Sequence, residues 1–191
     1  GCEVVATDMV EDTLEATKAA LLQAAERADL VLASGGVSVG EEDHVKPAVE
    51  ALGELNMWKL ALRPGKPVAF GHIGDTPVIG APGNPVSLFV TFLLFARPFI
   101  LKCMGLKDYR PRFRDMKAGF DWSRPDKRRE FHRARLQRAE DGGNEVIVYP
   151  SRSSAVLSSA VWADGLVMIG ESQKIARGDT VKYLPFCELL A

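Results

Sequence analysis

The sequence predicts an α/β domain, a three-layer sheet domain with mostly parallel strands, followed by a small all-β, barrel-like domain. Strand-length apolar runs alternate with helical patterns over residues 1–106, which is typical of a parallel-dominated sheet. From Arg112 onward, short alternating runs are separated by turn clusters, which is typical of a barrel or sandwich. Because the composition shifts near residues 105–111, we predict two domains, 1–106 and 107–191.

The expected elements of the first domain follow from the spacing of its apolar and turn residues. A helix capped by Asp12 or Thr13 is expected to run to about Ala28, since its leucines recur on one face. A second helix is expected at 44–52 and a third at 86–104, the latter with a kink at Pro98. Strands are expected at 1–6, 30–33, 55–62, 68–70 and 77–80.

The second domain is expected to contain strands only. No helical pattern is evident after Arg112. The alternating runs predict strands at 112–120, 130–137, 146–150, 166–169 and 180–184.

Composition excludes several classes of function. The 24 Lys and Arg residues balance 25 Asp and Glu residues, so no global field attracts nucleic acid or an acidic membrane. The basic run 127–129 is read as the solvent face of a strand, with a nucleic-acid surface as the alternative. Three scattered cysteines indicate a reducing compartment and no structural zinc. The uncharged span 78–96 is interrupted by Pro and Gly, which argues against a membrane helix.

The loop at residues 34–43 carries the first candidate site. Gly35, Gly36 and Ser38 leave main-chain amides free to surround an anion without a Cβ in the way. The acidic cluster that ends in Asp43 could bind a cation beside that anion, as a phosphate-bearing ligand with a metal ion would require. The alternative is a plain turn that leads into the next helix.

Two further loops follow predicted strands of the same domain. Arg63 and Lys66 lie on a Pro-Gly turn that would hold two cations together, unless it is simply an exposed basic turn. The loop 81–87 could bind an anion through helix-start amides and Ser87, or be an ordinary helix start. The carboxyl ends of neighbouring parallel strands are where ligands bind in α/β sheets, so the three loops could meet there.

Three segments resemble the C-terminal half of the MoeA family, the molybdopterin molybdenumtransferases. They are SGGVSVGEED at 34–43, WKLALRPGKP at 58–67 and GAPGNPVS at 80–87. The segment EFHRARL at 130–136 and the β-rich remainder resemble the last domain of that family more loosely.

The resemblance implies an enzyme that inserts molybdate into adenylylated molybdopterin and releases AMP and molybdenum cofactor. It also implies dependence on Mg²⁺ or another divalent ion, with molybdate as substrate. A cytoplasmic homodimer is implied, with an adenylyltransferase and molybdoenzymes as further partners and with no nucleic acid or membrane.

The resemblance also implies roles for particular residues. Asp43 would handle the metal and take part in catalysis together with Lys59 and Arg63, and this chain has Arg63 where several relatives have Lys. The other residues implied in substrate binding are Gly35, Gly36, Ser38, Lys66, Pro82, Asn84, Pro85, Ser87, Arg133 and Ser158.

Two alternatives remain open at this point. One is a MogA-like molybdopterin adenylyltransferase, which shares the α/β fold, and the other is a non-catalytic binding or scaffolding module. Nothing in the chain matches the N-terminal portion of the family, so we expect a fragment that binds ligand weakly and turns over poorly.

Overall fold

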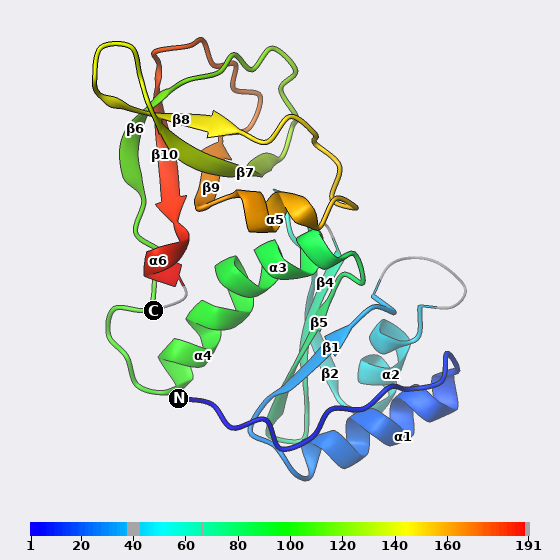
Figure 1. Ribbon diagram of the computed structural model, residues 1–191. Coiled ribbons are helices and arrows are strands. Elements are labelled where there is room, and N and C mark those ends of the chain that lie inside the picture. The colour runs from blue at the N-terminus through cyan, green and yellow to red at the C-terminus, as the bar shows by residue number, and fades with distance from the viewer. Residues whose placement is uncertain (38–42, 66, 190–191) are drawn as a thin grey trace. The chain divides into compact units, whose positions relative to one another are not determined.

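The computed structural model describes residues 1–37, 43–65 and 67–189, which form two compact units (Figure 1). The sheet unit comprises Gly1–Leu60 and Gly65–Thr91, and the barrel unit comprises Ala61–Pro64 and the chain from Phe92 onward. The division therefore falls inside a long helix, and the expected domain boundary at 106/107 stays a prediction.

The sheet unit is built on a four-stranded sheet with the order β1-β5-β4-β2. The strands are β1 (Val31–Ser34), β2 (Glu54–Lys59), β4 (Pro67–Ile73) and β5 (Thr76–Ala81). Only β1 and β5 pair in parallel, whereas β4 is antiparallel to both β5 and β2. The expected parallel majority is therefore wrong for the described strands, because the tight turn at Gly74 and Asp75 can join only antiparallel neighbours.

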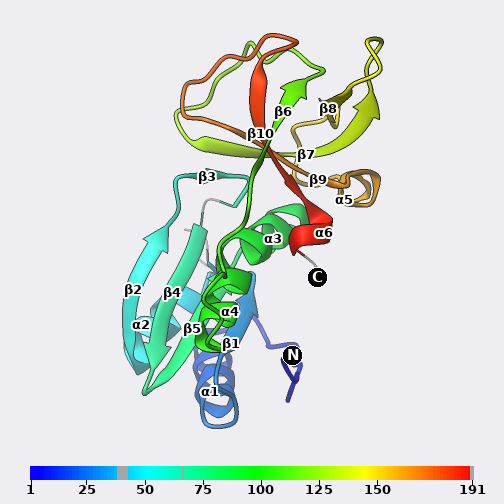
Figure 2. The same ribbon diagram turned by 90° about the vertical axis from the view of Figure 1, so that its left-hand side faces the viewer.

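Helices cover both faces of this sheet. Figures 1 and 2 show α1 (Leu14–Ala25) and α2 (Val45–Leu52) on one side and α3 (Pro85–Thr91) on the other. The Thr13 side chain accepts a hydrogen bond from the Ala16 amide and so caps α1. Buried side chains of α1, α2 and the strands form the core between them, among them Leu21, Val49 and Val78. The three-layer α/β fold class is confirmed.

The expected strand at residues 1–6 is wrong. Residues 1–10 contain no described strand and are exposed, with Val4 79% and Met9 103% accessible. A strand needs a partner for its amides and carbonyls, and the only described partner of β1 is β5. The local run of β-branched residues therefore did not suffice to form a strand.

The helix that follows β5 changes its winding along its length. It begins as α3, continues as the π-helical segment η1 (Phe92–Ala96) and ends as α4 (Arg97–Cys103). Pro98 has no amide hydrogen to donate, which accounts for the wider turn just before it. By length and composition alone Pro85–Cys103 could cross a membrane, and a third of it is buried. Core helices of soluble proteins meet the same test.

The barrel unit closes on itself. Its sheet runs β7 (Arg129–Arg138), β8 (Asn144–Val148), β6 (Arg114–Ala118), β10 (Thr180–Pro185) and β9 (Gly165–Ile169), and β9 pairs back to β7. The short strand β3 (Leu62–Arg63) adds to β7 in parallel. The predicted barrel-like domain is confirmed, since the five predicted runs correspond to these five strands.

The barrel unit also contains two short helices that we did not expect. They are α5 (Ser158–Trp162) and α6 (Phe186–Leu189). The expectation of no helix after Arg112 is therefore wrong. Helices of five and four residues are too short to show a 3.6-residue period in the sequence.

Candidate functional site

Two of the predicted loops meet at the carboxyl ends of β1 and β5. The register pairs Ser34 with Ala81, and the Gly35 amide donates to the Ala81 carbonyl at 2.9 Å. A Cβ on Gly83 would lie 3.3 Å from the Gly35 Cα, which is tighter than most observed Cβ contacts. The parallel pairing of β1 with β5 thus brings together two loops that are almost 50 residues apart in the chain.

The glycine loop has a backbone that requires glycine. Gly35 and Gly36 have φ values of +88° and +65°, which L-residues rarely adopt. The Gly36 carbonyl accepts the Val45 amide at 2.9 Å, which fixes the loop to the first residue of α2. Asp43 is half-buried two residues before α2 begins, while the predicted residue Ser38 lies outside the described residues.

The loop 81–87 is organised by Asn84. The Asn84 carbonyl accepts the Leu88 amide at 2.8 Å, and its side-chain oxygen accepts the Ser87 amide at 3.4 Å. Asn84 therefore caps α3 and fixes how the chain enters this helix. Pro82 and Ser87 are buried, whereas Pro85 is exposed as the first residue of α3.

The Pro-Gly turn contacts the same helix. Gly65 has a φ of +115°, and a Cβ at this position would lie 2.6 Å from the Thr91 hydroxyl and 3.6 Å from the Ser87 carbonyl. Gly65 of the third loop therefore lies against α3. Lys59 ends β2, where its backbone pairs with Pro67; its side chain and the whole of Lys66 lie outside the described residues.

Arg63 has carboxylate partners within the barrel unit. Its Nη1 donates to Asp126 Oδ2 at 2.9 Å, and its Nε lies 3.7 Å from Glu130 Oε1. The Arg63 side chain remains 36% exposed. Nothing in the sequence pattern indicated this pairing, because 63 residues separate Arg63 from Asp126. Whether Arg63 also meets Asp43 and Ser87 of the sheet unit stays a prediction.

Glu130 lies in a buried polar cluster. It is inaccessible to solvent and accepts Trp122 Nε1 at 3.2 Å and Arg152 Nη2 at 2.7 Å, while His132 Nε2 lies at 3.5 Å. Burial alone would raise the pKa of Glu130, but the interactions with His132 and Arg152 outweigh burial and lower it. The pKa of His132 is lowered, chiefly because its ring is buried.

Arg133 lies within the barrel unit and is only 1% exposed. Its Nε donates to Ser159 Oγ, and its Nη2 donates to the carbonyls of Ser151 and Ser153, each at 2.9 Å. Burial lowers the pKa of Arg133. Ser158, which begins α5, is exposed beside Ser159. The structure thus brings Arg133 into contact with Ser159, the neighbour of the predicted Ser158, and the role of Arg133 and Ser158 in binding substrate stays a prediction.

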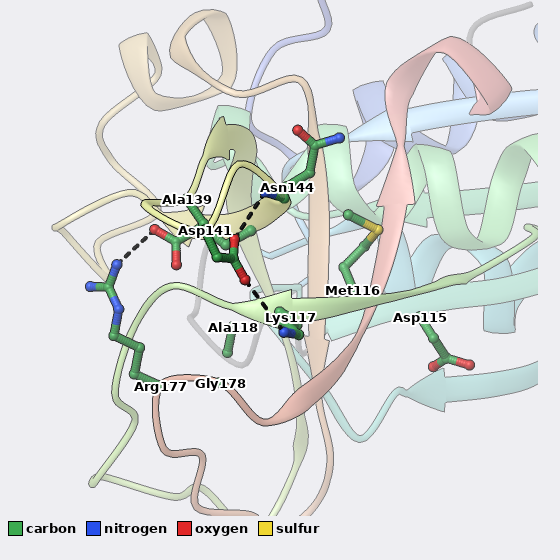
Figure 3. Close-up of a pocket in the computed structure, with 11 residues that line it drawn as sticks. Asp115, Met116, Lys117, Ala118, Ala139, Asp141, Asn144, Arg177 and Gly178 are labelled. Carbon is green, nitrogen blue, oxygen red and sulfur yellow. Dashed lines mark hydrogen bonds and ion pairs between the residues drawn. The ribbon is translucent and has the colours of Figure 1, made fainter.

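A cavity of about 460 Å³ opens on the barrel between β6 and β8 (Figure 3). It contains none of the predicted site residues. Figure 3 shows Lys117 facing Asp141, a pair whose charged atoms are 3.7 Å apart. Glu145 is likewise paired with Arg177 at 2.7 Å. Asp115, which also lines the cavity, is paired with Lys182 at 2.8 Å. Each of these charges therefore has a partner of opposite sign, and the cavity carries no argument for a ligand.

The donor set for a metal ion is sparse in the described part of the chain. No three His, Cys, Asp or Glu side chains gather there in a way that could hold an ion. Asp43 supplies one carboxylate, which fits Mg²⁺, since this ion is commonly held by one or two carboxylates together with substrate phosphates. The neighbouring carboxylates Glu41 and Glu42 lie outside the described residues.

The chain joins an α/β sheet domain, with paired loops at its strand ends, to a closed β barrel, and its family match places the sheet domain in the molybdopterin-binding class. Residues 1–102 match the family described as "Probable molybdopterin binding domain", and residues 115–186 match "MoeA C-terminal region (domain IV)". The chain belongs to the MoeA family, which confirms the resemblance noted in the sequence.

Named relatives and solved structures agree with this assignment. The chain is 35% identical over 99% of its length to a "Molybdopterin molybdenumtransferase" of Haemophilus influenzae, of which it covers 47%. It is 36% identical over 90% of its length to "Molybdopterin molybdenumtransferase 2" of Mycobacterium tuberculosis, of which it covers 43%. A crystal structure of the molybdopterin biosynthesis MoeA protein from Pyrococcus horikoshii aligns with a TM-score of 0.72 and 28% identity, covering 93% of this chain and 42% of that one. The chain thus spans less than half the length of these relatives.

Proposed function

We propose that the chain acts in molybdenum cofactor biosynthesis as the sheet and barrel portion of a molybdopterin molybdenumtransferase. The reaction inserts molybdate into adenylylated molybdopterin, yields molybdenum cofactor and releases AMP. The observation that supports this most directly is the meeting of the glycine loop with the loop 81–87, at Gly35 and Gly83, in a chain of the MoeA family. That edge of the sheet is where α/β domains bind anionic ligands.

The residues at this edge suit a substrate rich in phosphate and oxyanion groups. The Gly36 amide and the Val86 amide at the start of α3 can donate to phosphate oxygens, whereas the Gly35 amide already donates to the Ala81 carbonyl. Molybdate is a tetrahedral dianion, for which Arg63, Lys66 and the Ser87 hydroxyl are suitable donors. Lys59 would add positive charge where the AMP phosphate leaves.

Asp43 would hold Mg²⁺ or another divalent ion against the phosphate oxygens of the substrate. When bound, such an ion supplies Lewis-acid polarisation of the bond that is cleaved. The task of Asp43 is then to set where the ion sits. Arg133 and Ser158 would contribute to substrate binding from the barrel unit.

The assembly and its setting are proposed on the same family grounds. We assign a cytoplasmic homodimer, with an adenylyltransferase that supplies the substrate and with molybdoenzymes that receive the product. Because the relatives are more than twice as long as the chain, its isolated form should bind ligand more weakly than the longest form that its gene encodes. The MogA-like alternative accounts less well for the barrel that follows the sheet unit.

Calorimetry with molybdate, and with AMP plus Mg²⁺, tests the proposal on the chain and on the longest natural form. Arg63→Ala removes a charge-assisted donor worth about 1.5–3 kcal/mol, so molybdate affinity should fall at least about tenfold. Asp43→Asn should weaken binding of AMP only when Mg²⁺ is present. Arg129→Ala and Asp75→Asn are matched controls at exposed positions and should leave both affinities unchanged. No binding by the longest form would refute the transferase and leave the non-catalytic binding module.

A further inference from the structure

The backbone of Arg63 is fixed to the barrel. The strand β3 contains only Leu62 and Arg63, and it pairs in parallel with Arg129 and Glu130 of β7 (Figure 2). The Arg129 amide also donates to the Ala61 carbonyl at 3.2 Å. A two-residue strand has little stability of its own, so this pairing with β7 sets the position from which the Arg63 side chain extends.

Two carboxylates then hold the Arg63 guanidinium from two of its nitrogens. Asp126 accepts from Nη1 at 2.9 Å, and Glu130 lies 3.7 Å from Nε. Asp126 and Glu130 are mostly buried, with side chains 18% and 1% exposed, whereas Arg63 is 36% exposed. A half-exposed arginine would otherwise sample many rotamers, and these contacts confine it to a few.

Both carboxylates are themselves fixed by groups other than Arg63. Asp126 Oδ1 accepts the amide and the Nε of Arg128, at 2.9 and 3.0 Å. Glu130 is held by Trp122 and Arg152 as described above. Hydrogen bonds from Arg128, with a further one from Arg63, hold the pKa of Asp126 far below its usual range. The anchors of Arg63 are thus rigid and charged at neutral pH.

One nitrogen of the Arg63 guanidinium, Nη2, remains for a ligand. The described contacts of its guanidinium use Nη1 and Nε, and none of them uses Nη2. Nη2 is the third nitrogen of the same plane, so the contacts at Nη1 and Nε set the direction in which its N–H groups point, whereas a lysine ammonium at this position would not need such orientation. Pre-organised donors bind a charged ligand more tightly because less freedom is lost on binding.

We infer that Asp126 is a positioning residue for Arg63, supported by Glu130, and that it orients the guanidinium toward the oxyanion of the substrate. This inference rests on the proposed function for the identity of that oxyanion. Asp126 does not touch the substrate and acts only through Arg63. In a competing role, Asp126 merely neutralises the charge of Arg63. Removal of the carboxylate would then strengthen molybdate binding, whereas loss of a positioning residue weakens it.

The test combines molybdate calorimetry with chemical labelling of Arg63 in the longest natural form. Asp126→Ala should weaken molybdate binding about five- to twentyfold. Asp126→Asn keeps an acceptor oxygen, so its molybdate affinity should lie between those of the wild type and Asp126→Ala. The double variant with Arg63→Ala should bind no more weakly than Arg63→Ala alone, because Asp126 acts through Arg63. A purely structural role would make the two losses additive. Asp115→Asn, which breaks the exposed pair with Lys182, is the matched control.

Phenylglyoxal labelling followed by mass spectrometry reports on Arg63 without any ligand. Asp126→Ala and Asp126→Asn should each raise the labelling rate of Arg63 several-fold, while Asp115→Asn should not. If the wild-type protein binds no molybdate, the proposed function fails and the labelling rates alone decide this inference. Tighter molybdate binding by Asp126→Asn, additive losses or unchanged labelling would each overturn it.

Discussion

Replacing Gly65 by alanine tests whether the Pro-Gly turn lies against α3. The φ of +115° is unfavourable for any L-residue, and such strain costs about 1–3 kcal/mol. The new Cβ would also lie 2.6 Å from the Thr91 hydroxyl, and overpacking of a closely packed site costs about 1–3 kcal/mol more. We therefore expect Gly65→Ala to lower the free energy of unfolding by about 2–6 kcal/mol.

Two further variants separate backbone strain from the steric clash. Gly74 has a φ of +56° and no atom within 4 Å of a Cβ built on it, so Gly74→Ala should cost only the backbone strain. Thr91→Ala removes the hydroxyl that the new methyl group would contact. The double variant Gly65→Ala, Thr91→Ala should therefore recover about 1–3 kcal/mol relative to the sum of the single losses.

Urea unfolding followed by circular dichroism measures all four stabilities. The midpoints are compared only among variants that share the same dependence of unfolding free energy on urea, because a changed dependence indicates a changed unfolded state. If Gly65→Ala costs no more than Gly74→Ala, or if Thr91→Ala gives no recovery, the turn does not pack on α3. The convergence of the third loop with the helix start would then be wrong.

Three further predictions concern the barrel unit. The lowered pKa of His132 means that only the unfolded chain gains its proton near pH 6.5, so stability should fall as pH drops below 6.5, at up to about 1.4 kcal/mol per pH unit. His132→Gln should make the urea midpoint depend less on pH between pH 5 and 6.5, and an unchanged pH dependence would contradict this. Arg133→Met breaks one buried and two partly buried hydrogen bonds and should cost at least about 3 kcal/mol in urea unfolding, against less than about 1 kcal/mol for the exposed Arg138→Met. Tyr183→Phe removes the hydrogen bond that the phenol donates to Asp164 and should lower the melting temperature by an amount equivalent to about 1.5–3 kcal/mol, and an unchanged melting temperature would refute it.

The sequence predicted those elements that carry a local pattern, namely strands with alternating apolar and polar residues and helices with a capping residue. The five barrel strands were recognisable because apolar and polar residues alternate and turn residues bound each run. The cap of α1 at Thr13 was one of the two predicted positions. The motif at 80–87 located the helix start that Asn84 organises, since helix starts have a strong local signature.

Features that depend on distant parts of the chain could not be predicted in this way. The apolar run at 1–6 has the composition of a strand, but a strand also needs a neighbour, which no local window contains. The pairing of Arg63 with Asp126 joins residues 63 positions apart through β3 and β7. No local pattern around Arg63 or around Asp126 predicts that the two side chains pair. Burial of Arg133 was likewise hidden, because its three acceptors come from a later loop and from α5.

The central claim is that separate loops of this chain form one receptor for molybdate. X-ray diffraction at the molybdenum absorption edge, from crystals of the longest natural form grown with molybdate, tests it most directly. We predict an anomalous peak about 4 Å from donor atoms of both Arg63 and Ser87, because hydrogen bonds of about 3 Å would end on the oxygens that surround the molybdenum. A peak elsewhere, or coordinates that hold Arg63, Ser87 and Asp43 on different faces of the protein, would contradict the claim.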